Sequence, residues 1–345
     1  MTPAAASPPS EAPRHLPEER VGVLLPLPLG RTYDYRVPED TALADGDFVT
    51  VPLGARKATG VVWGKGEGGV AEAKMKDVLG RLDCPPLPEV CRRFVDWVAR
   101  YTLSAPGAVL KMAMSVPDAL NPPKPVSAYA LNPKAEGFRK TKARERVLKV
   151  LAVGPPRPVT ELALEAGTGP GVVRGLAGAG AIIPVQLPAR AAGPEAGPDW
   201  QKPGPDLSPD QARAAETLQE ATERGGFGVV LLEGVPGSGK TEVYFQAVAE
   251  ALKHGGQVLV LLPEIALSAQ WLKRFTERFG APPGAWHSDL TAAERRVTWR
   301  AVAEGRTRVV VGARSALFLP FPDLALIVAD EEHDPSFKQE DGVIY

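Results

Sequence analysis

The stretch GVPGSGKT, from Gly234 to Thr241, constrains the fold of this chain more than any other. It fits the phosphate-binding pattern G-x-x-x-x-G-K-[ST] at every fixed position. Its glycines let backbone N–H groups turn toward phosphate oxygens, and the helix predicted from Lys240 adds the positive end of its dipole. Lys240 is expected to reach the β- and γ-phosphates of ATP, and Thr241 to coordinate Mg²⁺. The predicted nucleotide ligands in this loop are Gly234, Gly237, Ser238, Gly239, Lys240 and Thr241.

An acidic motif follows further along the chain. The apolar run LALIVA leads into Asp330 and Glu331, so both carboxylates are predicted at the carboxyl end of a strand, where ligands bind in open α/β sheets. Asp330 is expected to hold Mg²⁺, and Glu331 to orient and deprotonate the attacking water, which makes these two residues and Lys240 the predicted catalytic residues. Polar residues after a strand can also form a plain exposed turn, but the phosphate loop favours the catalytic interpretation.

From residue 206 onward, apolar strands alternate with amphipathic helices. Strands are predicted at FGVVLL, QVLVLLP, RVVVG and LALIV, and helices at TEVYFQAVAEALKHG and EIALSAQWLKRFTERF. Such alternation is typical of a parallel sheet with helices on both faces. We therefore expect residues 206–345 to form a P-loop α/β domain in which a strand precedes the phosphate loop.

The N-terminal third has a different pattern. Residues 1–19, rich in proline and alanine, predict a disordered leader. Four short β-rich stretches bounded by proline and glycine follow, and their spacing favours a small β-barrel or sandwich. A helical element comes next, with Phe94, Trp97 and Tyr101 at helical spacing. We therefore expect residues 20–121 to form a compact β domain with a helical extension.

Proline-rich edges bracket residues 122–205. Inside them, KARERVLKVLA, PVTELALEAG and GPGVVRGLAGAGAIIPVQ predict three short helices, the last running into a strand. This is the outline of a winged helix-turn-helix, and a generic three-helix module is the alternative. Residues 111–200 hold 12 lysine and arginine residues against 7 acidic ones, whereas residues 201–345 hold 15 against 20. The basic middle region slightly favours DNA contact.

Composition excludes some classes of protein. The net charge of −1 indicates no partner by itself. The two cysteines, Cys84 and Cys91, are too few for a zinc site of paired doublets and suggest no disulfide scaffold. The N-terminus lacks a signal-peptide core, and no stretch reaches the length of a membrane span. These observations predict a cytoplasmic protein without a membrane association.

Five sequence blocks in this order resemble the superfamily 2 helicases, and within them the PriA family of replication-restart helicases. The blocks are GSGKTEVY, LLPEIALSAQ, HSDLTAAER, GARSALFLPF and DEEHDPSFKQEDG. The resemblance implies a multidomain α/β protein: an N-terminal β-barrel that binds the 3′ end of DNA, a winged helix, and the first RecA-like lobe of an ATP-dependent 3′-to-5′ DNA helicase, with ATP and Mg²⁺ as cofactors.

The resemblance also assigns roles within the helicase lobe. Gln211, in LSPDQ, is similar to the glutamine that recognises adenine ahead of the phosphate loop, although such a residue can also simply start a helix. His333 resembles the residue that couples the nucleotide state to DNA. In the tail DPSFKQEDGVIY, Val343 and Ile344 stand where the family is usually more aromatic or basic. The residues implied to lie along single-stranded DNA are Ser268, Gln270, Arg314 and Ser315.

In the N-terminal domain, PLPLGRTYDYRVP carries the resemblance to the family's 3′-end-binding domain. It implies that Tyr33 stacks on the terminal base and that Asp34 accepts a hydrogen bond from the 3′-OH. Lys76 would pair with a phosphate, and Gly54 would allow close approach of the backbone. Without the resemblance, an aromatic-Asp-aromatic triplet in a β domain is more often core packing and a turn.

The family continues into a second lobe with arginines that complete the ATP site and a zinc module, and this sequence reaches neither. The resemblance thus implies a protein that recognises abandoned replication forks, with forked and single-stranded DNA, single-stranded DNA-binding protein, primosome proteins and the replicative helicase as partners. Two alternatives stay open. One is a non-enzymatic fork-binding adaptor that lacks the second lobe, and the other is a P-loop ATPase that moves on duplex DNA. Because the second lobe completes the ATP site in this family, negligible ATP hydrolysis is expected from residues 1–345 alone.

Overall fold

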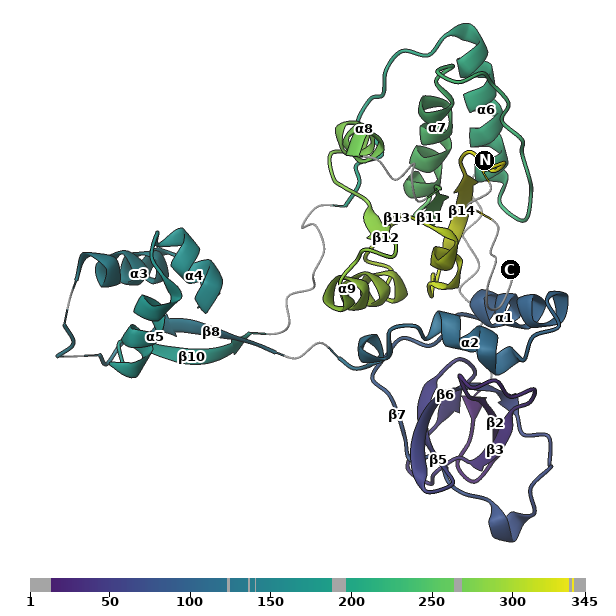
Figure 1. Ribbon diagram of the computed structural model, residues 1–345, viewed down its shortest axis with the longest axis horizontal. Coiled ribbons are helices and arrows are strands. Elements are labelled where there is room, and N and C mark those ends of the chain that lie inside the picture. Colours follow the sequence, from purple (N-terminus) through teal and green to yellow (C-terminus); the bar gives the residue numbers. More distant parts are fainter. Residues whose placement is uncertain are drawn as a thin grey trace, which may run out of the picture. The chain divides into compact units, whose positions relative to one another are not determined.

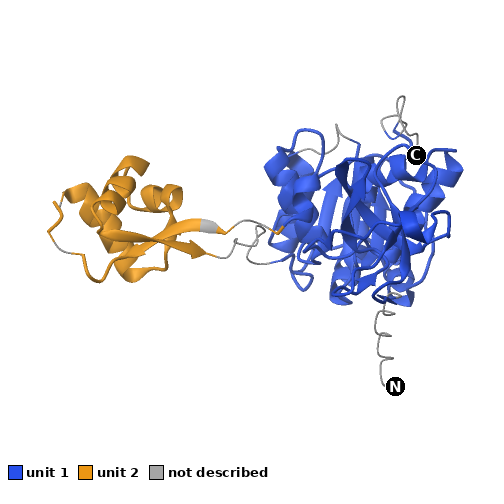
Figure 2. Cartoon of the chain, turned by 90° about the horizontal axis from the view of Figure 1, so that it is seen from below, with its two compact units in different colours: residues 1–121, 193–345 blue, residues 122–192 orange. Residues whose placement is uncertain are grey.

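The computed structural model describes residues 14–122, 125–135, 137–139, 141–187, 197–263, 269–334 and 337. These residues divide into two compact units (Figure 2). The larger unit comprises residues 1–121 and 193–345, and the smaller comprises residues 122–192. Each unit is described by itself below.

The larger unit begins with a five-stranded antiparallel sheet (Figure 1). Its strand order is β3-β2-β6-β5-β7. The Arg36 N–H donates to the Lys76 carbonyl, and the Val78 N–H donates to the Arg36 carbonyl, each over 3.0 Å. The segment before edge strand β7 is therefore bonded to the other edge strand, β3. The strands are β2 (Arg20–Leu24), β3 (Tyr33–Arg36), β5 (Phe48–Leu53), β6 (Arg56–Lys65) and β7 (Gly80–Arg81), with a short helix η1 (Glu72–Lys74) between β6 and β7.

Alternation of side chains gives this sheet its core. Successive strand residues face opposite sides, and one side carries a row of apolar residues. Four of the stretches that the sequence predicts as strands correspond to β2, β3, β5 and β6. The buried cluster they form is Val21, Val23, Leu25, Tyr35, Val37, Leu43, Val49, Val51, Val62 and Val78.

The disordered leader predicted for residues 1–19 is too long. Strand β1 (Arg14–His15) pairs with β4 (Leu43–Ala44), and the His15 side chain is buried, with Nε2 2.7 Å from Asp45 Oδ1. Composition alone does not reveal this pairing, because the proline-rich stretch supplies only two residues to it. The rest of the predicted leader, residues 1–13, lies outside the described residues.

Two helices join this sheet to the rest of the unit. Helix α1 (Glu89–Tyr101) ends well before Pro106, which opens α2 (Pro106–Ala113), and a short helix η2 (Pro117–Leu120) follows. Gly107 in α2 lies against the sheet: a Cβ at this position would stand 2.1 Å from the carbonyl oxygen of Leu27, so no larger residue fits. Apolar residues of both helices share one buried cluster with residues of the C-terminal region, among them Trp299 and Phe318.

The C-terminal region contains a four-stranded, fully parallel sheet of order β12-β13-β11-β14 (Figure 1). Helices alternate with the strands, as the sequence predicts for an α/β domain. The strands are β11 (Gln257–Leu261), β12 (Gly284–Trp286), β13 (Val309–Gly312) and β14 (Leu324–Ala329), and the helices are α6 (Pro209–Arg224), α7 (Lys240–Lys253), α8 (Ala269–Phe279), α9 (Ala292–Ala303) and η4 (Arg314–Phe318).

The strand predicted at FGVVLL is wrong. Residues 225–239 contain no strand, and the Phe227, Val229 and Leu231 side chains are 97%, 81% and 70% exposed. Apolar content favours a strand, but a strand forms only where a neighbour accepts and donates its backbone hydrogen bonds. In the part of the chain that the structure describes, the outer edge of β14 has no strand beside it. The sequence therefore predicts the phosphate loop correctly in position but not the strand before it.

The smaller unit contains three helices and a three-stranded antiparallel sheet of order β10-β8-β9. The helices and the last strand match the prediction for this region, whereas β8, which pairs along its whole length with β10, is absent from it. Val147, Leu162, Val173 and Leu176 are fully buried between the helices. The elements are β8 (Val126–Leu131), α3 (Lys142–Val153), β9 (Arg157–Pro158), α4 (Val159–Glu165), α5 (Pro170–Gly178) and β10 (Ile182–Leu187).

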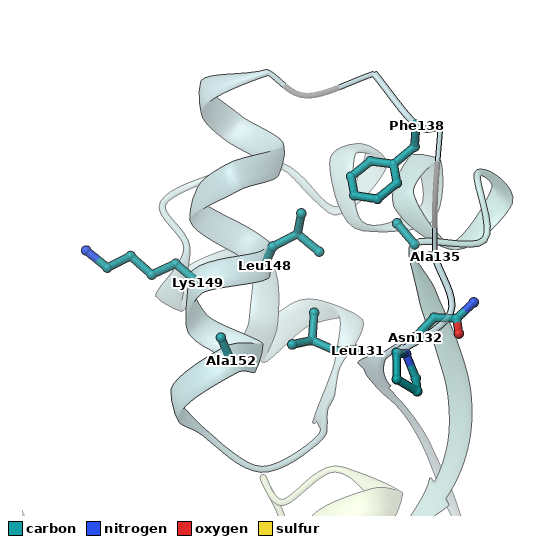
Figure 3. A pocket seen from close by; sticks show the side chains of 9 residues that line it. Leu131, Asn132, Ala135, Phe138, Leu148, Lys149 and Ala152 are labelled. Carbon is teal, nitrogen blue, oxygen red and sulfur yellow. The ribbon is translucent and has the colours of Figure 1, made fainter.

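An open hollow of about 640 Å³ lies on the smaller unit (Figure 3). Figure 3 shows Phe138 and Leu148 facing each other across it, and Lys149 directed away. Its lining is mainly apolar and includes none of the residues predicted to bind nucleotide or DNA. The residues predicted to bind nucleotide all belong to the larger unit.

The sequence-based boundary at residue 205 differs from the division into units, which ends the smaller unit at residue 192. The backbone N–H of Asp199 donates to the Phe279 carbonyl over 2.8 Å, and the Arg278 guanidinium donates to the Lys202 carbonyl. Phe279 and Arg278 both belong to α8. Residues 197–205 therefore contact the parallel-sheet region, although their proline content suggests a linker.

Candidate functional site

The phosphate loop lies directly before α7. Gly237 and Gly239 have φ angles of 79° and 81°, a left-handed conformation that glycine adopts without strain. Lys240 Nζ donates to the Gly234 carbonyl over 2.7 Å, so the loop folds back on its own lysine. A Cβ at Gly234 would stand 2.6 Å from Ser238 Oγ, which makes a side chain there incompatible with the loop.

A buried polar atom in the loop is consistent with a site for the ATP phosphates. Ser238 Oγ is buried and has no hydrogen-bond partner among the described residues, so a polar group is left to be satisfied inside the loop. Thr241, the predicted Mg²⁺ ligand, follows Lys240 in the first turn of α7. No cluster of three or more His, Cys, Asp or Glu side chains suitable for a metal occurs in the described ranges. A magnesium ion held by one or two protein ligands and by substrate phosphates needs no such cluster.

Gln211 contacts the loop directly. It is the third residue of α6, and its side chain completes a capping box, because Oε1 accepts from the Ser208 N–H over 2.9 Å. Its amide Nε2 donates to the Ser238 carbonyl over 2.8 Å. A Cβ at Gly239 would come within 2.5 Å of the same Nε2, so a glycine at position 239 is needed for this contact. The structure therefore brings together Gln211 and the phosphate loop, as the sequence implies for a nucleotide site.

Asp330 lies beside α7 at the carboxyl end of β14. Its backbone N–H donates to the Leu261 carbonyl over 3.0 Å, which fixes it where the parallel strands end. Its Oδ2 accepts a hydrogen bond from the Tyr244 hydroxyl over 2.9 Å. Tyr244 and Lys240 are four residues apart on α7 and so occupy the same helix face. The acidic motif and the phosphate loop, distant in sequence, therefore meet through α7.

Tyr244 is buried, and Trp271 Nε1 of α8 donates to its hydroxyl over 2.7 Å. Burial raises the pKa of Tyr244 far above its usual value of 10.0, and the charge of Asp330 raises it further. The tyrosine is therefore held protonated, as a donor to the carboxylate.

Glu331 and His333 lie in the turn after Asp330. Glu331 has a φ of 54°, an uncommon conformation for a residue with a side chain. Such strain is concentrated at functional sites, where the surrounding structure maintains it. His333 Nε2 lies 3.6 Å from Glu331 Oε2, and both side chains are exposed. The imidazole and the carboxylate are therefore both open to solvent.

The residues implied to contact single-stranded DNA follow two neighbouring strands. Arg314 and Ser315 open η4 directly after β13, and Gln270 is exposed in the first turn of α8 after β11. The carboxyl ends of parallel strands share one edge of a sheet, so these residues lie along the edge that carries Asp330. The Arg314 guanidinium donates to the Phe337 carbonyl. Ser268, together with Val343 and Ile344 of the tail, lies outside the described residues.

In the N-terminal sheet, Asp34 is buried and holds a turn. Its Oδ1 accepts from the Glu67 N–H over 3.0 Å, and its Oδ2 accepts from the Gly68 N–H over 2.8 Å. Arg20 Nη1 lies 3.5 Å from the same carboxylate. The carboxylate implied to bind a 3′-OH therefore already accepts two backbone hydrogen bonds.

Tyr33 and Asp34 lie on opposite faces of β3, because consecutive strand residues alternate. Tyr33 is half-buried against the apolar cluster that contains Tyr35, and Arg31 Cζ lies 5.9 Å from the centre of its ring. Gly54, with a φ of 60°, forms the turn between β5 and β6, and Lys76 is exposed before β7. These four residues belong to one small sheet and its turns, and the Lys76 carbonyl accepts a hydrogen bond from the Arg36 N–H.

Sequence reasoning missed Tyr244 and Trp271. A signal for Tyr244 was present: it closes the block GSGKTEVY and follows Lys240 by one helical turn, which places it on the loop's side of the helix. Trp271 carries no comparable signal, because only the folded structure brings α8 against α7.

Two parts of this chain match models of known protein families. Residues 22–115 match the family model described as the 3′DNA-binding domain (3′BD), and residues 208–344 match the model of the DEAD/DEAH box helicase. Among the described helices, none is long and apolar enough to cross a lipid bilayer.

The relatives found carry one name. The replication restart protein PriA of Rickettsia felis is 33% identical over 326 residues, which cover 94% of this chain and 39% of that protein. The PriA of Haemophilus influenzae is 33% identical over 347 residues, covering 94% of this chain and 46% of that protein. The PriA of Bacillus subtilis is 35% identical over 220 residues, covering 62% and 27%. The chain thus spans less than half the length of these relatives, and by its sequence and its two domain matches it belongs to the PriA family.

Proposed function

We propose that this chain provides the DNA-recognition part and the first RecA-like motor lobe of a replication-restart helicase that unwinds DNA in the 3′-to-5′ direction. The observation that carries the proposal is the hydrogen bond of 2.9 Å between Tyr244 and Asp330, which joins the phosphate-loop helix to the acidic motif. Gln211 adds a third nucleotide motif at the same place through its bond to Ser238.

The residues around the loop would divide the work on ATP. The N–H groups of the loop and Lys240 would bind the phosphates, and Thr241 and Asp330 would hold Mg²⁺. Bound Mg²⁺ neutralises negative charge on the β- and γ-phosphates. Glu331, exposed next to Asp330, would orient and deprotonate water. The Gln211 amide uses one N–H on Ser238 and one lone pair on the Ser208 N–H, and it would contact adenine with its second N–H and second lone pair.

The N-terminal sheet would act as a small β-barrel that recognises the 3′ end of a DNA strand. Tyr33 would stack on the terminal base, and Lys76 and the Gly54 turn would receive the adjoining phosphate. Asp34 uses two of the roughly four lone-pair sites of a carboxylate on backbone N–H groups, which leaves capacity for a 3′-OH. Support comes from the match of residues 22–115 to a 3′DNA-binding domain.

The smaller unit would act as a winged helix that contacts duplex DNA at the fork. Its three helices and antiparallel sheet have the composition of that module, and its charge is positive. Residues Ser268, Gln270, Arg314, Ser315 and His333 would follow single-stranded DNA along the carboxyl edge of the parallel sheet. The domain limits we propose are 14–121, 122–192 and 193–345, because β1 pairs with β4 and residues 197–205 are bonded to α8.

We further propose that the protein works in the cytoplasm on stalled or abandoned forks. Its partners would be single-stranded DNA-binding protein, primosome proteins and the replicative helicase, which it would help to reload. The adaptor that binds forks without nucleotide is the less favoured alternative, since Gln211, Lys240 and Asp330 converge at one site.

Binding measurements on the chain test this function. We expect a fluorescent ADP analogue to bind in the presence of Mg²⁺ and K240A to abolish that binding while leaving affinity for forked DNA unchanged. Forks that end in a 3′-OH should bind more tightly than forks that end in a 3′-phosphate. Loss of both nucleotide and fork binding in a folded K240A variant, or equal affinity for the two fork ends, would contradict the proposed division of roles.

A further inference from the structure

The hydroxyl of Tyr244 lies between two side chains from different parts of the parallel-sheet region. Its Oη donates to Asp330 Oδ2 over 2.9 Å and accepts from Trp271 Nε1 over 2.7 Å. Tyr244 and Trp271 are 5% and 7% exposed, so water does not replace these bonds. Asp330, which is expected to hold Mg²⁺, is therefore bonded to a buried tyrosine that is itself fixed by a tryptophan.

The direction of each bond follows from the groups themselves. An indole N–H only donates, and an ionised carboxylate only accepts. The Tyr244 oxygen must therefore accept from Trp271, and its single proton must go to Asp330.

Both aromatic side chains are fixed by neighbours. The Tyr244 ring meets the Phe245 ring edge-on, with centroids 5.3 Å apart, and the Trp271 ring stacks on Phe275 with centroids 5.4 Å apart. Packing of this kind holds a ring in one orientation. The hydrogen bonds thus join rigid groups, which is what exact placement of a carboxylate requires.

We propose that Tyr244 and Trp271 are positioning residues for the Mg²⁺ site. Tyr244 holds Asp330 through Oδ2 and leaves Oδ1 available as a metal ligand. Trp271 fixes the Tyr244 hydroxyl and so links the start of α8 to the metal ligand. This inference rests on the proposed function, because it concerns the metal of the same nucleotide site.

The test compares Y244F and W271F with the unaltered chain by titrating Mg²⁺ against a fluorescent ADP analogue. Y244F keeps the ring and removes the hydroxyl, so the Mg²⁺ concentration for half-maximal nucleotide binding should rise roughly tenfold. Affinity for the analogue in EDTA should not change. W271F, which keeps the ring stack and removes the N–H, should give a smaller rise of the same kind.

Two matched variants control for a general loss of stability. Tyr35 is another buried tyrosine, with a hydroxyl that donates to the Pro52 carbonyl over 3.0 Å, and Trp63 donates to Asp96 over 3.2 Å. Y35F and W63F should leave the Mg²⁺ dependence unchanged. NMR of the indole N–H groups gives a second readout: the Trp271 signal should shift in Y244F, and in the unaltered chain when Mg²⁺ and ADP are added.

The possible failures differ. If the unaltered chain binds no analogue at any Mg²⁺ concentration, the proposed nucleotide function fails and this inference fails with it. If the unaltered chain binds and Y244F has the same Mg²⁺ dependence, the positioning role alone is refuted. A rise in the required Mg²⁺ that Y35F reproduces would also refute it, because the effect would then come from stability.

Discussion

The amide of Gln211 donates a hydrogen bond of 2.8 Å to the carbonyl of Ser238, so the first residues of α6 support the phosphate loop directly. The two residues are 27 positions apart in sequence. A glutamine that only recognised adenine would not need this contact. Gln211 therefore has a structural role in the loop in addition to the adenine contact that we propose.

Replacing Gln211 should weaken the binding of both ATP and GTP. Q211A removes the bond to Ser238, which contributes about 1 kcal/mol, or roughly a fivefold loss of affinity for either nucleotide. ATP should lose more than GTP, because the adenine contact is lost as well. Isothermal titration with both nucleotides measures this difference, and S208A, which removes the helix cap but keeps Gln211, is the control. Unchanged affinity for GTP in Q211A would contradict the supporting role.

Asp34 should affect both stability and DNA binding. D34A leaves the N–H groups of Glu67 and Gly68 without their acceptor, which should lower the free energy of unfolding by about 1–3 kcal/mol. It should also reduce the preference for a 3′-OH over a 3′-phosphate at the fork end. Thermal unfolding and fluorescence anisotropy measure the two effects. Y33A is the comparison variant, because replacing the half-buried Tyr33 should weaken DNA binding with a smaller loss of stability. If D34A keeps the preference for a 3′-OH end, Asp34 does not belong to the DNA site.

How much of this structure the sequence predicts depends on whether the cause is local. Helix α7 and strand β13 follow from apolar spacing within a few residues, and the phosphate loop follows from fixed glycine positions. The segment FGVVLL is also mainly apolar, yet it forms no strand, because strand pairing depends on a distant partner. Strand β8 forms although the sequence does not predict it. Its partner β10 begins about 50 residues later, and its proline-rich flanks suggest a linker.

The same distinction applies to the candidate site. Lys240, Thr241, Asp330 and Glu331 are predictable, because their motifs carry the chemistry in fixed spacing. The bond between Tyr244 and Asp330 joins residues 86 positions apart, and no local pattern indicates it. The two backbone bonds to Asp34 are likewise formed by a turn more than 30 residues further along the chain. Sequence thus identifies the chemical groups, whereas folding determines what holds them.

The exposed segment before the phosphate loop should be cleaved by protease earlier than helices α7 and α8. Phe227 is 97% exposed and Leu231 is 70% exposed, and neither lies in a helix or strand. Chymotrypsin should therefore cut after these residues before it cuts at the buried Phe245 or Phe275. Mass spectrometry of early fragments identifies the sites. Because the segment adjoins the loop, Mg²⁺ and ADP should slow this cleavage; first cuts inside α7 or α8 would contradict the described exposure.

The two cysteines should react slowly and lower the stability of the fold at alkaline pH. Burial raises the pKa of both Cys84 and Cys91 from 9.0 to about 12. The folded chain therefore binds these thiol protons more tightly than the unfolded chain, so stability is present below pH 9 and decreases as the pH rises from 9 toward 12. At pH 8, Ellman's reagent should react with both thiols much faster in urea than in buffer. Rapid reaction of both thiols in the folded chain would contradict the burial.

Substituting Arg300 should destabilise the larger unit as a whole. Arg300 of α9 is 9% exposed, and its Nη1 donates to the carbonyls of Asp83 and Ala119 over 2.9 and 3.3 Å, which joins the C-terminal region to the N-terminal part of the unit. R300A leaves these carbonyls unpaired and removes one of the two arginine partners of Glu304, bonded over 2.6 Å, which should cost about 2–4 kcal/mol. The larger unit should unfold in one transition at a lower temperature, because the N-terminal part and the parallel sheet share a buried cluster. The exposed Arg296 on the same helix is the matched control, and R296A should leave that transition within about 0.5 kcal/mol of the unaltered chain. Two transitions of the larger unit in the unaltered chain, besides any transition of the smaller unit, would show that its two regions fold independently and that Arg300 does not join them.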